Sequence, residues 1–401
     1  MHPLRNKNFR LLLGTQVFGS LSASFFEIPI FWWLIETTGS GSIVALTAFV
    51  SSVAYLIAAP WGGVWADKVS KKRIVISAYA VDAGLTALAA YLLLIGQLTL
   101  AFLLILLAIT NLLTAFRSPS LGSLLPLLIE KSRYQEGNAA MGLATTVATL
   151  LSAAAAGVAT ATLGVSGAIF LGAGFIMVAL GFMCFLEEPV AKAVPSASSQ
   201  QAPALMAGFK VLRDNPLLAV IVFMATLLNF ILSPLTVLFA PYVLELGASA
   251  AGFGFLSAMV ALGQLLGLIA LNIIKIKQVL RVLTVGTFSI ATALLALAFA
   301  PTLLFAVLAI SVLGLSASIM GVTISTLFQE RIPPDVLGRS MGLMSALTQA
   351  AQPAGFVAAA GLLTVTSVRR SFIMLGILMS LAATVWLRPR IKKQFHQSAA
   401  N

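Results

Sequence analysis

The sequence contains few of the residues that perform chemistry in enzymes. It has one cysteine and two histidines in 401 residues. The single cysteine, Cys184, excludes an internal disulfide and a metal site built from several cysteines. The histidines, His2 and His396, lie near the two ends of the chain, and no Walker motif for nucleotide phosphates occurs. We therefore expect no catalytic residues, no metal site, no cofactor and no ATP hydrolysis.

Charged residues are also scarce. Asp, Glu, Lys and Arg make up 9% of the chain, whereas hydrophobic residues make up 60%. Soluble domains carry about 25% charged residues. Most of this chain is therefore expected to lie in lipid.

Apolar stretches long enough to cross a hydrocarbon core of about 30 Å, roughly 20 residues each, recur along the whole sequence. A span in lipid must satisfy its own backbone hydrogen bonds, as a helix does, and the short alternating segments of a membrane barrel are not found in the sequence. The first span is too long for a secretory signal. We predict an all-α integral membrane protein with twelve transmembrane helices, at about 11–35, 42–66, 74–95, 99–119, 139–162, 167–186, 216–243, 249–273, 280–300, 302–327, 341–365 and 371–387.

The basic residues are distributed unevenly between the two sides of the predicted membrane. The chain has 24 Lys and Arg against 12 Asp and Glu. If the N-terminus lies inside, every Lys and Arg except Arg369 and Arg370 falls on the cytoplasmic side. This is the positive-inside bias, so both termini are predicted to be cytoplasmic. The positive charge is explained by topology, and no nucleic-acid partner is expected.

The predicted spans divide into two groups of six. Residues 1–187 are expected to form an N-terminal six-helix bundle, and residues 214–401 a C-terminal one. The segment 188–213 between them is rich in Pro, Ser, Ala and Gln and is predicted to be a cytoplasmic linker. Pro29 and Pro234 lie in the first span of each group, and "MGL" opens the fifth span of each, which indicates two related halves.

The loop after the second span reads "GGVWADKVSKKR". It resembles the signature loop of the major facilitator superfamily, with the matching positions filled by Gly63, Asp67, Lys68, Lys71 and Lys72. Other stretches narrow the resemblance to the drug-efflux branch that includes macrolide efflux proteins and the enterobactin exporter: "ETTGSGS", "FRSPSLGSLLPLL", "VLRDNPLL" and "FQERIPPDVLGRSMGL".

The resemblance implies the major facilitator fold, with two pseudo-symmetric six-helix bundles, in a bacterial cytoplasmic membrane. It implies a monomer that exports a small molecule by alternating access, driven by protons and acting on an amphipathic or cationic organic compound such as an antibiotic. Export of a siderophore or a lipid-like metabolite, and uncoupled uniport, remain open alternatives. In this family the signature loop acts as a conformational latch that stabilises the outward-open state.

Two acids lie deep in predicted spans. Glu27 is about 13 Å from the outer end of the first span, and Asp82 is about 12 Å from the inner end of the third. An ionised acid at such depth costs at least about 2.5 kcal/mol. Glu27 is therefore a candidate for proton coupling or for neutralising a cationic substrate, or else it forms a hydrogen bond that fixes packing. For Asp82, a structural or gating hydrogen bond and a substrate contact are both open.

Arg117 is predicted at the inner end of the fourth span. It could attract an anionic group, or its side chain could extend to the membrane surface. The spans of the second half carry no charge, so their candidates for a substrate cavity are neutral. The full set of neutral candidates is Gln16, Phe25, Phe31, Asn111, Asn229, Pro234, Gln264, Gln349 and Gln352.

Overall fold

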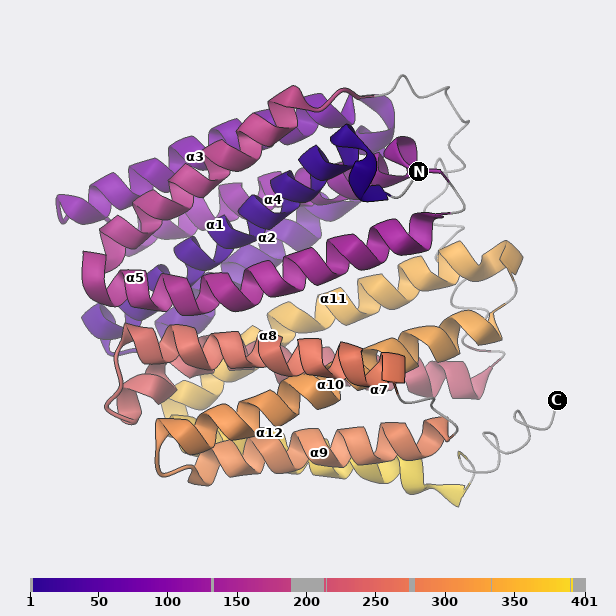
Figure 1. Ribbon diagram of the computed structural model, residues 1–401. Helices are drawn as coiled ribbons and strands as arrows, with labels where there is room; N and C mark the ends of the chain where they lie inside the picture. The colour runs from indigo at the N-terminus through magenta and orange to yellow at the C-terminus, as the bar shows by residue number, and fades with distance from the viewer. Residues whose placement is uncertain are drawn as a thin grey trace. The chain divides into compact units, whose positions relative to one another are not determined.

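The computed structural model describes residues 3–130, 133–188, 213, 215–273, 278–332, 334–389 and 391. Within the predicted linker, residues 189–212 lie outside the described residues. The described residues form eleven α-helices, one short 3-10 helix and no strand (Figure 1). The predicted all-α class is therefore confirmed.

The helices are long and follow one another through short connections. The first half of the chain contains the 3-10 helix Pro3–Arg5, followed by α1 (Lys7–Thr38), α2 (Gly41–Lys68), α3 (Lys71–Leu94), α4 (Leu100–Leu128) and α5 (Tyr134–Phe185). The remaining helices are α7 (Pro216–Glu245), α8 (Ala250–Ile273), α9 (Val279–Phe299), α10 (Leu303–Arg331), α11 (Pro334–Val365) and α12 (Val368–Leu387).

Ten of these helices are long and apolar enough to cross a membrane, judged on the described residues. One of them, α5, has 52 residues and contains the two predicted spans at 139–162 and 167–186. Gly164, between those spans, has non-helical angles (φ 74°, ψ 172°). Glycine adopts a positive φ without steric penalty, so α5 is two spans joined at this residue. The helix α11 is not among these ten helices. Its sequence contains many alanines and glycines and two glutamines.

The chain forms two compact units. Unit 1 comprises Met1–Gly39, Leu46–Ser198 and Ala248–Ala258, and unit 2 comprises Ser40–Ala45, Ser199–Gly247 and Met259–Asn401. Within unit 1, α1 and α3 pack on α5, and α3 also packs on α4. Within unit 2, α7 packs on α11 and α12, and α9 packs on α10 and α12. The packing pattern of one unit thus recurs in the other.

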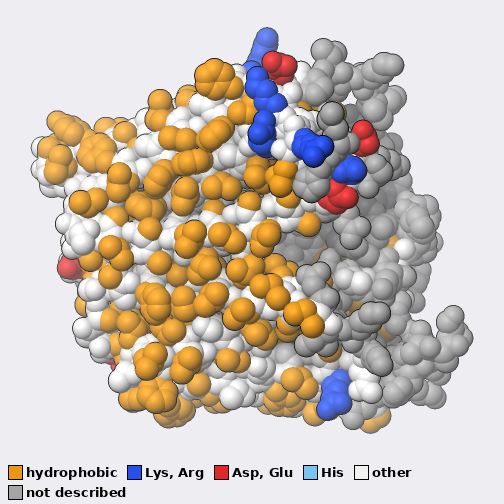
Figure 2. All heavy atoms as spheres, viewed as in Figure 1, with side chains coloured by type: hydrophobic (Ala, Val, Ile, Leu, Met, Phe, Trp, Pro, Cys, Tyr) orange, Lys and Arg blue, Asp and Glu red, His pale blue; other side chains and the backbone are white. Residues whose placement is uncertain are grey.

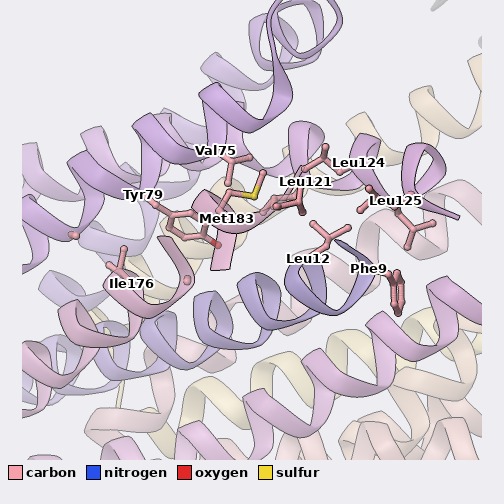
Figure 3. Close-up of a cluster of buried hydrophobic side chains, with 13 residues drawn as sticks. Phe9, Leu12, Val75, Tyr79, Leu121, Leu124, Leu125, Ile176 and Met183 are labelled. Atoms are coloured by element: carbon pink, nitrogen blue, oxygen red, sulfur yellow. The ribbon is translucent and has the colours of Figure 1, made fainter. Parts of the chain in front are cut away.

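A cluster of buried side chains holds the helices of unit 1 together at one end (Figure 3). Phe9 and Leu12 of α1 contribute to it, and Leu124 of α4 is fully buried within it. Helices in lipid associate mainly through close van der Waals packing, which this cluster provides. Its other labelled members are Val75, Tyr79, Leu121, Leu125, Ile176 and Met183.

The surface agrees with a membrane environment. Hydrophobic side chains cover most of the face seen in Figure 2, and the coloured charged side chains lie toward the ends of the helices. One charged contact closes an end of unit 2: Arg369 Nε lies 2.9 Å from Glu245 Oε1. Arg369 Nη1 also donates to the backbone carbonyls of Ala298, at 3.1 Å, and Ala300, at 3.0 Å. This arginine therefore satisfies carbonyl groups at the C-terminus of α9.

Candidate functional site

The helix α1 begins and ends with well-defined caps. The Asn6 side chain accepts hydrogen bonds from the backbone N–H groups of Asn8 and Phe9, and Gly39 ends the helix in the left-handed conformation (φ 62°). Inside the helix, Pro29 has no N–H to donate, so the carbonyl of Phe25 lacks its usual partner. Gly172 of α5 approaches this carbonyl closely, because a Cβ there would lie 3.3 Å from the oxygen.

One face of α1 is polar and open. Gln16, Ser20, Ala23 and Glu27 follow one another at steps of four, three and four residues, which places them on one face of a helix. Ala23 and Glu27 are exposed, and Gln16 and Ser20 are partly open, whereas the three residues that follow Glu27 are buried. The structure therefore joins two of the predicted residues, Gln16 and Glu27, in one stripe.

Glu27 is an exposed acid with no cation beside it in the described part of the chain. Among the described residues it forms no hydrogen bond and no ion pair. Its side chain is exposed. The Glu27 side chain is therefore not packed into the core. One turn earlier, Ser24 accepts a 2.7 Å hydrogen bond from the buried Ser152 of α5, which ties this part of α1 to its neighbour.

Asp82 and Arg117 form an ion pair. Arg117 Nη1 of α4 lies 2.7 Å from Asp82 Oδ2 of α3, and the two side chains are 16% and 13% exposed. The helix α4 continues to Leu128, beyond the end predicted at residue 119, so Arg117 lies eleven residues, or about 16 Å, from the end of the helix. The helix therefore extends beyond the predicted end of the span, and the charge of Arg117 is paired inside unit 1.

Two further contacts hold this arginine. Arg117 Nη2 donates to Thr114 Oγ1 at 3.1 Å, and the guanidinium carbon lies 4.4 Å from the centre of the Tyr79 ring. A cation over an aromatic face is attracted by the ring electrons. The Tyr79 hydroxyl in turn lies 2.5 Å from the place that a Cβ at Gly19 would occupy. The ion pair thus belongs to a cluster that joins α3 and α4 to α1.

Of the neutral residues of unit 2 that are predicted to line a substrate cavity, four lie on two adjoining helices and one lies elsewhere. Gln349 and Gln352 of α11 form a side-chain hydrogen bond of 2.9 Å, and the partly buried Asn229 lies on the adjoining helix α7 with the buried Pro234. Gln264 is exposed on α8. The structure therefore brings four of the five predicted residues onto one pair of helices.

The remaining candidates lie in unit 1. Phe25 is 5% exposed and packs its ring edge-on against Phe175, with centres 5.0 Å apart. Phe31 is buried as well. Asn111 is partly buried and donates to the Leu107 carbonyl of its own helix at 2.9 Å. No group of three or more His, Cys, Asp or Glu that could hold a metal ion occurs among the described residues.

The signature loop connects α2 and α3. Gly63, Asp67 and Lys68 lie in α2, and the surroundings of these three residues are outside the described part of the structure. Lys71 and Lys72 open α3, and Lys72 Nζ donates to the backbone carbonyl of Cys184 at 2.8 Å. This contact joins the loop to the end of α5 within unit 1.

Glu188 was not recognised from the sequence. Its carboxylate accepts hydrogen bonds from the backbone N–H groups of Lys71, at 3.0 Å, and Lys72, at 3.3 Å, and from the Ser70 hydroxyl. A carboxylate is stabilised at a helix N-terminus by the unpaired N–H groups there. The sequence gives little indication of this contact, because Glu188 and Lys72 are 116 residues apart in the chain.

The fold and the helix pattern define a multi-pass helical membrane protein. The sequence profile of the Major Facilitator Superfamily matches residues 12–355, and the chain belongs to this family. Macrolide efflux protein A of Streptococcus pyogenes is 23% identical over 390 residues, covering 94% of each chain. The enterobactin exporter EntS of Citrobacter koseri is 26% identical over 316 residues, covering 76% of this chain and 72% of that relative.

Solved structures show the same fold. The nucleoside transporter NupG superposes with a TM-score of 0.74 at 15% identity, covering 95% of this chain and 98% of that one. A POT family transporter in complex with a thioalcohol conjugated peptide gives a TM-score of 0.76 at 10% identity, covering 94% and 95%. The predicted major facilitator fold is therefore confirmed, and family and fold are those of a transporter.

Proposed function

We propose that this protein is a secondary exporter that couples the inward movement of protons to the outward movement of an amphipathic or cationic organic compound. The observation that carries the proposal is the contrast between two intramembrane acids. Asp82 is neutralised by Arg117, whereas Glu27 is open and has no cation partner among the described residues. Glu27 can hold a proton or face a positively charged compound, and one occupant excludes the other.

The comparisons favour export as the direction. Two kinds of relative, a macrolide efflux protein and an enterobactin exporter, carry compounds out of the cell by their names. Proton movement into the cell is energetically downhill in bacteria and drives such export when both share one carboxylate. Alternating access between two repeats is the usual route in transporters of this build.

The location and assembly are part of the same proposal. The distribution of Lys and Arg supports placing both termini in the cytoplasm of a bacterium, with the chain acting as a monomer in the cytoplasmic membrane. The signature loop, including Lys71 and Lys72, would stabilise the outward-open state. Glu188 accepts hydrogen bonds from the backbone of Lys71 and Lys72, and these bonds hold the loop in place, which supports this role for the loop.

The test is transport into proteoliposomes with an imposed pH gradient. Wild-type protein is expected to concentrate a macrolide against its gradient, whereas Glu27→Gln should let it equilibrate without accumulation. Glu36→Gln is the matched control, because Glu36 is an exposed acid in the last turn of the same helix. Accumulation by Glu27→Gln at the wild-type level would show that Glu27 does not couple transport to protons.

Export of a metal-chelating siderophore is the second candidate, supported by the enterobactin exporter. A siderophore that carries negative charge would not be attracted to Glu27. Competition against macrolide uptake by cationic, neutral and catecholate compounds separates the two functions, because the proposal expects the cations to compete best. A uniporter would equilibrate its substrate with or without the pH gradient.

A further inference from the structure

The helix α11 has two different open faces. Ala346, Ala350 and Ala354 are exposed and apolar, as expected for a face toward lipid. A second face carries Ser345, Gln349, Gln352 and Phe356 at steps of four, three and four residues. These four residues are exposed or partly open. The glutamines are thus concentrated on a side of the helix distinct from its apolar exposed side.

The two glutamines leave hydrogen-bonding groups unused. Gln352 Nε2 donates to Gln349 Oε1 at 2.9 Å. Neither side chain has another partner among the described residues, so the Gln349 amide nitrogen and the Gln352 amide oxygen remain available. Buried polar groups that serve packing alone are nearly always satisfied within the protein. An open amide pair inside a predicted span therefore points to a ligand or to water.

The neighbouring helix α7 adds polar groups of the same kind. The Ser233 hydroxyl donates to the backbone carbonyl of Gln352 at 3.4 Å, so α7 packs beside α11 at this position. Asn229, one turn before Ser233 on the same face, donates to the Ala225 carbonyl at 3.0 Å, and its side-chain oxygen has no partner among the described residues. We name Asn229, Ser233, Gln349 and Gln352 the neutral patch.

Prolines remove one backbone donor from each helix next to the neutral patch. Pro234 cannot donate to the carbonyl of Phe230, and Pro353 cannot donate to the carbonyl of Gln349, because proline has no N–H. The Ser233 hydroxyl lies 3.5 Å from the Phe230 oxygen, a long contact. The carbonyl of Gln349 is therefore left without its usual helical donor, and no charged side chain belongs to the neutral patch.

We propose that the neutral patch binds an uncharged hydrogen-bonding part of the transported compound, such as a hydroxyl or ester carbonyl group. It rests on the proposed function and deepens it by giving the substrate a further chemical requirement, namely neutral groups that can pair with the amides of the neutral patch. Amides both donate and accept hydrogen bonds, so hydroxyl groups suit them. A cation without hydrogen-bonding groups gains nothing from these residues.

The test is equilibrium binding to purified protein without any gradient. The probes are erythromycin, which has several hydroxyl groups and one amine, and tetraphenylphosphonium, a cation without hydroxyl groups. Gln349→Leu and Gln352→Leu are each expected to weaken erythromycin binding about tenfold, because a lost hydrogen bond leaves a polar partner unsatisfied. The affinity for tetraphenylphosphonium should stay within about twofold, which also shows that each variant is folded.

Gln278→Leu is the matched control. Gln278 is exposed before α9, its side chain forms no capping hydrogen bond, and its replacement should change neither affinity. Equal losses for both probes would assign the glutamines to packing, and unchanged erythromycin binding, or wild-type protein that fails to bind erythromycin, would also overturn the proposal. Failure of proton coupling is recognised separately, because it appears only in the gradient experiment with Glu27→Gln.

Discussion

Breaking the ion pair between Asp82 and Arg117 should destabilise unit 1 more than removing the pair altogether. In Asp82→Asn the guanidinium keeps its charge at a position where its side chain is 16% exposed. Its remaining contacts are the Thr114 hydroxyl at 3.1 Å and the Tyr79 ring at 4.4 Å, and neither is a negative charge. Removing one partner of a buried pair costs about 3–5 kcal/mol, because the other charge is left uncompensated.

The size of the effect can be converted into a melting temperature. For a unit of about 150–250 residues, 1 kcal/mol shifts the Tm by roughly 2–4 °C. Asp82→Asn is therefore expected to lower the Tm by roughly 6–20 °C, and Arg117→Gln by a similar amount. The double variant leaves no unpaired charge, so its Tm should lie above that of either single variant.

Thermal unfolding in detergent, followed by circular dichroism, measures these shifts. Glu245→Gln is the control, since it breaks a pair with Arg369 whose side chains are 39% and 31% exposed. An exposed pair contributes about 1 kcal/mol or less, so the control should change the Tm by a few degrees at most. If the double variant loses the sum of the two single losses, Asp82 and Arg117 act independently and the reasoning fails.

Two further substitutions test local contacts by the same melting measurement. Glu188→Ala should cost about 1–2 kcal/mol, because α3 loses the carboxylate at its N-terminus, whereas the exposed neighbour changed in Glu187→Ala should have little effect; equal losses would contradict the capping role. Gly355→Ala should cost about 1–3 kcal/mol, because the new Cβ would lie 2.6 Å from the Phe230 carbonyl oxygen. Gly361→Ala on the same helix has open space around it and should not destabilise, so a loss there equal to that of Gly355→Ala would show that the close approach is not the cause.

Some residues of the candidate site could be found without a structure. Glu27 stands in an apolar run of membrane length, and an acid there is expensive in any packing arrangement. Its neighbours Gln16 and Ser20 share its face because the helix has a fixed period of 3.6 residues. Polar stripes of this kind follow from one helix alone, so sequence reasoning reaches them.

Contacts between helices could not be found in this way. Asp82 and Arg117 are 35 residues apart on different helices, and the Ser233 contact to α11 spans 119 residues. Whether such side chains meet depends on the rotation and depth at which two helices pack, which many small apolar contacts decide together. For the same reason Glu188 was overlooked, although it contacts the signature loop directly.

The amino-acid sequence by itself determined that this protein crosses the membrane as helices and that its family is that of a transporter. Lipid leaves the backbone no partner but itself, so an apolar run of sufficient length has only one stable form. Only the tertiary structure decided which polar groups are paired within the protein and which keep unpaired atoms. Asp82 is neutralised because Arg117 packs beside it, while Glu27 and the amides of Gln349 and Gln352 keep unused groups because no described neighbour reaches them.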